Sequence, residues 1–456
     1  MAGIGFELRK LLQKQSLVGL LQAYTYAGVI GSGPWVLSIV GMLVIGFFSA
    51  SVVVPGYRVT QFQVSVTYLI ALSLIFTGPV QLAFTRFVSD RLFEKREDLV
   101  MSNFNGLLCG VFLAATLVGL PALFVALPGT SNFYRILMLA AFVLLCGIWV
   151  ALIFLSGLKR YRAIVALYAI GYGITVVLAL ALRGWGLEGL LLGFVIGHFV
   201  LLAGMWGLTA WEYRPPRLVS FEFLRREWRY PSLMGIGLLY NLGVWADKFM
   251  FWGYPGTHER IIGWLHASVI YDLPVFLAYL GIIPGMAVFL VRIETDFVEY
   301  YERFYDAVRS GGSLAVIQEM RDEMVYAIRQ GLGEIGKIQT LAVLLLLVSG
   351  PAVLRSLGIS ELYLPLLNVQ AVGASLQVVM LALFNVFFYL DMRRQILLLC
   401  AEFLALNVIL TAASLVLGAA WYGYGFALAA LATLVTGLFT LDRKLRRLEY
   451  ETFMLQ

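Results

Sequence analysis

The 456-residue sequence is poor in charged residues, with only 13% in total, and it has three cysteines and three histidines. Soluble globular domains are about one quarter charged. The deficit therefore excludes a soluble enzyme, a nucleic-acid-binding domain and a disordered chain. The composition is 61% hydrophobic, so we expect lipid to surround most of the chain.

The few cysteines and histidines form no metal-binding or catalytic pattern. No Cys-x-x-Cys pair occurs, and the histidines lack the spacing of zinc ligands. A glycine-rich phosphate loop ending in Lys-Ser or Lys-Thr is also missing. Ser, His and Asp occur only on separated apolar runs. We therefore predict no metal, no other cofactor and no enzyme activity.

Long apolar runs are abundant. Each is near the length of about 20 residues that a helix needs to cross a bilayer, and helices satisfy their own backbone hydrogen bonds in lipid. The runs predict an all-α integral membrane protein with about twelve transmembrane helices in two six-helix lobes. The predicted spans are 22–49, 62–86, 100–126, 136–157, 162–182, 188–210, 232–252, 268–291, 338–358, 364–390, 395–418 and 423–441.

Lysine and arginine predict that both termini are cytoplasmic. With this topology 27 of the 33 basic residues lie in cytoplasmic segments, five lie in the opposite loops, and Lys248 lies inside a span. The formal net charge of +6 therefore faces anionic lipid rather than nucleic acid.

The predicted organisation has five parts. Residues 1–21 are amphipathic and predict an interfacial helix rather than a cleavable signal peptide. The remaining parts are an N-lobe (22–210), a cytoplasmic linker (211–231), a C-lobe (232–441) that includes a cytoplasmic loop (292–337), and a tail (442–456).

Repeated motifs favour an ancient duplication of the two halves. In each half a proline in the second span precedes an Arg-x-x-x-Asp pair, whose spacing puts both charges on one helix face as a boundary ion pair. The two sets are Pro79, Arg86 and Asp90, and Pro284, Arg292 and Asp296.

Glycine and proline inside spans mark places where helices bend or open. The candidates are Gly33, Pro34, Gly78, Pro79, Pro284 and Gly285. These residues fit either packing bends or a moving part.

The loop 292–337 predicts two short helices around Ser310-Gly311-Gly312-Ser313. It is too short for a glycosyltransferase domain. It could be a hairpin on the membrane surface or a docking site for a cytosolic partner.

Ionisable groups inside spans are costly and are therefore candidates for function. Asn241, Asp247 and Lys248 lie in the seventh span. Lys248 is near the outer end and could extend to the interface, and adjacent residues on a helix need not pair. A transport role and a structural ion pair both remain open for Asp247.

Three further residues are candidates for the substrate path or for coupling: Asp272, Glu402 and His198. Asp272 fits an interfacial position equally well. His198 stands alone among apolar residues, which is more typical of a hydrogen-bonded packing residue.

Several segments carry a resemblance to a known family. They are Ala2-Gly-Ile-Gly-Phe-Glu-Leu-Arg-Lys-Leu-Leu12, Gly33-Pro34-Trp35 with Leu37-Ser38, and Phe76-Thr-Gly-Pro-Val-Gln81 followed by Thr85-Arg86. Here the sequence resembles the PelG family, inner-membrane components of the bacterial Pel exopolysaccharide machinery. That family is similar to polysaccharide transporters of the multidrug/oligosaccharidyl-lipid/polysaccharide (MOP) exporter superfamily. Asn241 and Asp247-Lys248 loosely match the seventh span of those transporters.

The resemblance implies export of nascent Pel polysaccharide, rich in galactosamine and N-acetylgalactosamine, across the bacterial cytoplasmic membrane. The implied partners are the membrane proteins PelD and PelE and the cytosolic glycosyltransferase PelF. An ion-coupled antiporter or flippase of the same fold, acting on a lipid-linked sugar or a small molecule, is the alternative. A mostly structural scaffold for the synthase is a third possibility.

Overall fold

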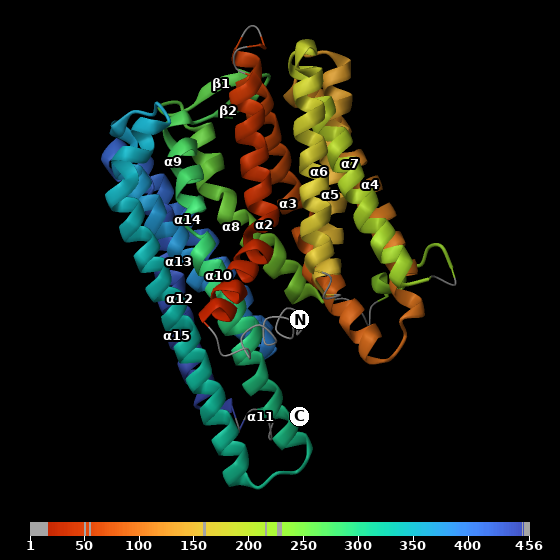
Figure 1. The fold of residues 1–456 in the computed structure, drawn as a ribbon, viewed down its shortest axis with the longest axis vertical. Helices are drawn as coiled ribbons and strands as arrows, with labels where there is room; N and C mark the ends of the chain where they lie inside the picture. Colours follow the sequence, from red (N-terminus) through yellow and green to blue (C-terminus); the bar gives the residue numbers. More distant parts are fainter. Residues whose placement is uncertain are drawn as a thin grey trace. The chain divides into compact units, whose positions relative to one another are not determined.

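The structure is a computed structural model that describes residues 17–448 and 450, apart from 50–51, 54–55, 158–160, 215–216 and 226–229. Its helices are α2 (Leu17–Ser49), α3 (Tyr57–Phe93), α4 (Asp98–Ala126), α5 (Asn132–Gly157), α6 (Tyr161–Leu182), α7 (Leu187–Glu212), α8 (Pro231–Gly253), α9 (Val269–Leu280), α10 (Ile283–Val291), α11 (Val298–Arg309), α12 (Leu314–Ser356), α13 (Leu364–Tyr389), α14 (Arg393–Leu417) and α15 (Tyr424–Leu445). Two strands, β1 (Glu259–Ile262) and β2 (Leu265–Ala267), form an antiparallel hairpin (Figure 1). The predicted interfacial helix falls mainly on residues 1–16, outside the described residues.

The chain packs into two units. Unit 1 comprises Met1–Ser32, Ala246–Tyr254 and Val269–Gln456, and unit 2 comprises Gly33–Trp245 and Pro255–Ser268. Helices α2 and α8 contribute residues to both units. The predicted lobes, 22–210 and 232–441, instead gave each of these helices to one lobe.

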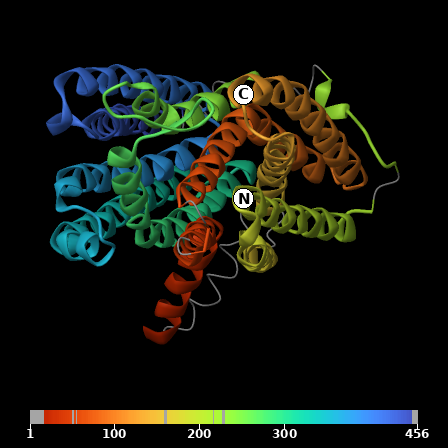
Figure 2. The ribbon, with the colours of Figure 1, turned by 90° about the horizontal axis from the view of Figure 1, so that it is seen from above.

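Small residues let the helices of unit 2 approach one another closely. Helices α6 and α7 lie side by side (Figure 2). A Cβ atom on Gly193 would lie 2.3 Å from the backbone nitrogen of Ala179, so only glycine fits this contact. The aromatic rings of Phe104 and Phe154 stack 4.7 Å apart and join α4 to α5.

The β-hairpin belongs to unit 2 and was not expected from the sequence, which indicated only a short loop. The Trp264 amide donates to the Ala126 carbonyl at 2.8 Å. The Gln61 side chain donates to the Ile261 carbonyl at 3.1 Å. These bonds hold the hairpin against α3 and the end of α4.

In unit 1, α13 and α14 both pack along α15 (Figure 1). A Cβ on Gly425 would lie 2.4 Å from the Thr411 hydroxyl, so this glycine lets α15 approach α14. A Cβ on Gly373 would lie 2.8 Å from the Phe426 ring. Both close contacts position side chains of the candidate site described below.

Among the described residues, nine helices are long and apolar enough to cross a membrane, or eleven if each of two bent helix pairs is one span. The bent pairs are Tyr24–Gly31 with Val36–Ser49, and Val269–Leu280 with Ile283–Arg309. Helix α8 also has 23 residues, but its Asn and its Asp-Lys pair lower its hydropathy. The sequence predicts this helix as the seventh of the twelve spans, and that assignment stays a prediction. The cytoplasmic placement of both termini stays a prediction.

The structure of segment 292–337 differs from the expected pair of short helices. A π-helical turn, Arg292–Phe297, joins α10 directly to α11. The chain turns at Gly311, whose φ is 70°, and Ser313 caps α12. Helix α12 then runs for 43 residues, so the expected second short helix and the ninth span are one helix. No proline interrupts it before Pro351, and most of its buried residues lie between Ile317 and Gln339.

Candidate functional site

Asp247 on α8 is completely buried in unit 1, with 0% of its surface exposed. The Lys248 ammonium lies 3.2 Å from each of its carboxylate oxygens. The prediction that these neighbours need not pair overlooked the reach of lysine, whose flexible four-carbon stem brings the ammonium back to the carboxylate. The two residues thus form a buried ion pair.

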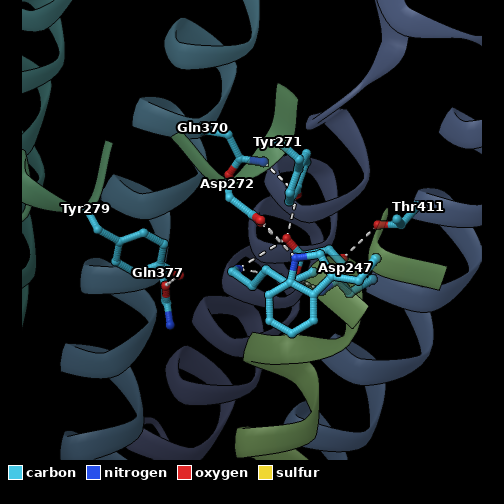
Figure 3. Close-up of polar contacts among 10 residues, drawn as sticks. Asp247, Tyr271, Asp272, Tyr279, Gln370, Gln377 and Thr411 are labelled. Atoms are coloured by element: carbon cyan, nitrogen blue, oxygen red, sulfur yellow. Dashed lines mark hydrogen bonds and ion pairs between the residues drawn. The ribbon is translucent and has the colours of Figure 1, made fainter. Parts of the chain in front are cut away.

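Residues from three other helices complete the environment of Asp247 (Figure 3). The Tyr271 hydroxyl on α9 donates to Asp247 Oδ2 at 2.5 Å and accepts from the Gln370 amide on α13 at 2.7 Å. The Asn407 amide on α14 lies 3.4 Å from Asp247 Oδ1, and Thr411 donates to the Asn407 oxygen at 3.0 Å. Each group that donates to the carboxylate is itself hydrogen-bonded to a second polar side chain.

Lys248 is only 6% exposed and does not extend to the interface as its place in the span suggested. Its Nζ lies 5.5 Å from the centre of the Tyr279 ring and 4.7 Å from that of Phe426. The Tyr279 hydroxyl donates to Gln377 at 2.7 Å, which fixes the ring (Figure 3). The ammonium is therefore held by one carboxylate and two aromatic rings.

Asp272 is half-buried on α9 and accepts two bonds from the Trp252 indole of α8, at 2.9 and 3.0 Å. It therefore lies close to the ion pair, next to Tyr271 (Figure 3). Glu402 has a different environment, since the Thr436 hydroxyl of α15 donates to it at 2.8 Å. The structure thus brings two of the three predicted carboxylates to one neighbourhood.

His198 and Asn241 lie in unit 2. His198 is 1% exposed, with Nδ1 2.8 Å from the Phe194 carbonyl and Nε2 3.4 Å from the Tyr172 hydroxyl. Its ring stacks on that of Phe194, and these contacts are those of a hydrogen-bonded packing residue. The Asn241 amide donates to the Gly237 carbonyl one turn earlier on α8, at 2.8 Å.

The predicted helix-break residues near Pro79 serve close packing. Helix α3 continues through Pro79. A Cβ on Gly78 would lie 2.6 Å from the carbonyl oxygen of Gly237, and one on Gly237 would lie 2.0 Å from that of Gly78. Helices α3 and α8 therefore cross with their backbones in contact. Gly33 is buried, and the side chain of Pro34 lies outside the described residues.

Pro284 and Gly285 lie where the eighth span bends by 40°, between α9 and α10. Pro284 stands in the first turn of α10, where a missing N–H costs nothing. A Cβ on Gly285 would lie 2.5 Å from the Gln339 side chain of α12. The bend is therefore accompanied by a tight contact between α10 and α12.

Both predicted boundary ion pairs form. Arg86 Nε lies 3.1 Å from Asp90, and Arg292 Nη1 lies 2.6 Å from Asp296. Arg292 Nε also lies 2.5 Å from Glu334 on α12. All these side chains are partly exposed, so each pair contributes less than about 1 kcal/mol.

Sequence reasoning missed the neutral polar residues that complete the site: Tyr271, Gln370, Asn407 and Thr411. The sequence could have indicated two of them. Asn407 and Thr411 are four residues apart, so they lie on one face of an otherwise apolar helix. It also missed Glu294, which is 7% exposed and accepts from Asn385 at 2.8 Å and Tyr389 at 2.9 Å. No group of three His, Cys, Asp or Glu residues that could hold a metal occurs in the described part of the chain.

Comparison with known proteins places this arrangement in a family. The family model "PelG: Putative exopolysaccharide Exporter (EPS-E)" matches residues 1–453. The chain belongs to the PelG family. The match confirms the resemblance of the sequence to PelG and extends over nearly the whole chain. A comparison with curated proteins finds no match.

Solved structures similar to this PelG-family chain are transporters of the MOP superfamily. A multidrug resistance MATE transporter in an outward-facing conformation has a TM-score of 0.65 at 15% identity, covering 93% of this chain and 96% of its own. A MOP superfamily transporter from Pyrococcus furiosus has a TM-score of 0.67 at 14% identity, with the same coverage. These likenesses confirm the predicted fold class. Family and fold together give a multi-pass membrane protein with a transport role.

Proposed function

We propose that this protein exports nascent Pel exopolysaccharide across the bacterial cytoplasmic membrane and so supports formation of the biofilm matrix. The observation that carries the proposal is the PelG family match over residues 1–453, on a chain with a transporter fold. The substrate is a polymer rich in galactosamine and N-acetylgalactosamine, and it is partly cationic.

The charge of the polymer gives the buried carboxylates a role. A cationic chain that leaves a cell with a negative interior moves against the membrane potential, at about 2.3 kcal/mol per charge per 100 mV. Asp247 and Asp272 lie close together in unit 1, and Glu402 lies elsewhere on α14. In this proposal Asp272 and Glu402, which are partly exposed, compensate substrate charge during passage, and Asp247 supports this region through its buried ion pair. Polymer synthesis supplies the driving force.

The proposed partners are PelD and PelE in the membrane and the glycosyltransferase PelF in the cytosol. Helix α11 packs along the first part of α12, and several of its charged side chains are exposed. We assign docking of the cytosolic partner to this pair of helices.

Complementation tests the proposal. A strain that lacks the gene is complemented with the wild-type chain, with Asp247→Asn, or with Glu361→Gln, whose side chain is 52% exposed and lies outside helices α11 and α12. Wild type and the Glu361 variant should restore secreted Pel, whereas Asp247→Asn should reduce it at equal protein level. Normal secretion from Asp247→Asn, Asp272→Asn and Glu402→Gln would remove the proposed role of the carboxylates.

An ion-coupled antiporter or flippase for a lipid-linked sugar or small molecule is the second candidate, favoured by the likeness of the fold to MATE transporters. Reconstitution separates the two candidates. A solitary antiporter moves its substrate in liposomes that contain only this protein and an ion gradient. The Pel exporter requires its partners.

A further inference from the structure

The Asp247 carboxylate needs a positive partner, because an unpaired carboxylate inside a membrane span is very costly. That partner can be a metal ion, a proton or a basic side chain. Here it is the neighbouring lysine on the same helix, with both N–O distances at 3.2 Å. The equal distances place the ammonium symmetrically across the carboxylate, where a small bound cation would also lie.

Oxygen atoms around the carboxylate resemble the surroundings of such a cation. The Tyr271 hydroxyl oxygen contacts the carboxylate, whereas Asn407 donates to it through its amide nitrogen and accepts from Thr411 with its oxygen. Gln370 is 0% exposed, and its amide oxygen has no hydrogen-bond partner among the described residues, although its nitrogen donates to Tyr271. Figure 3 draws the Gln370 amide beside Tyr271, so a buried oxygen without a donor stands at this cluster.

The aromatic rings of Tyr279 and Phe426 complete the environment of the ammonium, at 5.5 and 4.7 Å. Such rings stabilise an organic ammonium ion as well as a metal ion. The lysine is tethered next to Asp247 in the chain, so it competes with any free cation at a high effective concentration.

We propose that the oxygen atoms of Asp247, Tyr271 and Gln370 form a monovalent-cation site whose resident cation in this protein is the Lys248 ammonium. The wild-type site then takes up no sodium. Removal of the ammonium converts the same pocket into a site for a free alkali cation. The inference concerns the site used in the proposed function, but binding of an ion is measured without any transport.

The experiment measures the melting temperature of the purified full-length protein while sodium chloride replaces choline chloride at constant ionic strength. Wild type should not respond to sodium. Lys248→Met should gain a saturable increase of about 3 °C or more, since a ligand that binds only the folded state stabilises it.

Two controls assign the effect to this pocket. Lys337→Met removes an exposed lysine of α12 and should leave the sodium response at zero. The double variant Asp247→Asn/Lys248→Met should lose the sodium response. In Lys248→Ala, methylammonium should raise the melting temperature, and the bulkier tetramethylammonium should not.

A saturable sodium response of the wild type that Asp247→Asn abolishes would overturn the proposal. A folded Lys248→Met protein without any sodium response would also overturn it. The wild-type measurement gives a decision even if the Lys248 variants do not fold. Loss of Pel export tests the proposed function separately, so either idea can fail alone.

Discussion

Replacement of Asp247 by asparagine should strongly destabilise the protein, and simultaneous replacement of Lys248 by methionine should largely restore it. The single change leaves a lysine that is 6% exposed without its carboxylate. The double change substitutes two neutral side chains of similar size. This double-mutant cycle measures the coupling within the buried pair.

The expected magnitudes follow from what each variant leaves behind. Removal of one partner of a buried ion pair costs about 3–5 kcal/mol. We expect Asp247→Asn at this level, because the buried ammonium, which lies against the Tyr279 and Phe426 rings, loses its carboxylate. Lys248→Met should cost about 1–3 kcal/mol, since the carboxylate retains the Tyr271 and Asn407 donors.

The double variant should lie within about 2 kcal/mol of wild type, because neutral replacement of a buried pair is often tolerated. The coupling energy is then at least about 2 kcal/mol. Unfolding free energy in mixed micelles is the assay. The matched control is the Asp306–Arg309 pair, with both side chains 69% exposed, for which the coupling should be less than about 1 kcal/mol. Additive effects at Asp247 and Lys248 would refute the reasoning.

Three further predictions test other parts of the structure by thermal unfolding of the purified protein. Gly78→Leu should destabilise the protein by about 1–3 kcal/mol or prevent folding, because the leucine side chain would meet the α8 backbone. The control Gly110→Leu lies on an open surface and should be nearly neutral. Equal effects of the two variants would contradict the crossing of α3 and α8. Glu294→Leu should cost about 1–3 kcal/mol, because the Asn385 amide and the Tyr389 hydroxyl would lose their acceptor, and the exposed Glu319→Leu should have little effect; an unchanged melting temperature for both would argue against the buried carboxylate. Gly336→Pro should lower the free energy of unfolding by about 3 kcal/mol, because α12 is continuous at this position. The control Gly336→Ala should be neutral or stabilising. A stable Gly336→Pro protein would favour two separate helices.

The spans could be predicted from the sequence because lipid imposes one strong rule, an apolar run of sufficient length. Even α8 was predicted, although its Asn241 and its Asp247-Lys248 pair lower its hydropathy. The apolar residues on both sides of these polar positions still form a run that is long enough for a helix of 23 residues.

The joint between α10 and α11 and the length of α12 could not be predicted in the same way. A helix that leaves the membrane keeps its backbone hydrogen bonds while its residues change from apolar to polar. The polar stretch from Leu314 to Lys337 therefore indicated a loop element, although the backbone continues unbroken into the ninth span. Only a stop signal such as proline or a left-handed glycine would have marked an end, and the one at Gly311 was recognised.

The sequence predicted the charged residues of the candidate site but not its neutral polar residues. Asp247 was conspicuous because charge is rare in the spans, but Asn407 lies 160 positions away on another helix. No local pattern connects two residues at that separation, and only the packing of α8 against α14 brings them together. The prediction that Lys248 extends to the interface was wrong for a similar reason. The Tyr279 and Phe426 rings that contact its ammonium come from two other helices, α9 and α15.

The support around the ion pair is unequal, and this inequality bears on what the site does. The carboxylate is held by Tyr271 and Asn407, and each of these is held by a further polar side chain. The ammonium lies against the carboxylate and two aromatic faces, and such faces also attract other cations. The two members of the pair therefore differ in chemistry, because hydroxyl and amide donors hold the carboxylate whereas ring faces lie against the ammonium. A change in the packing of α9 or α14 would first move the Tyr271 and Asn407 donors away from the Asp247 carboxylate. The position of the Lys248 ammonium would then follow from the remaining charge of the carboxylate.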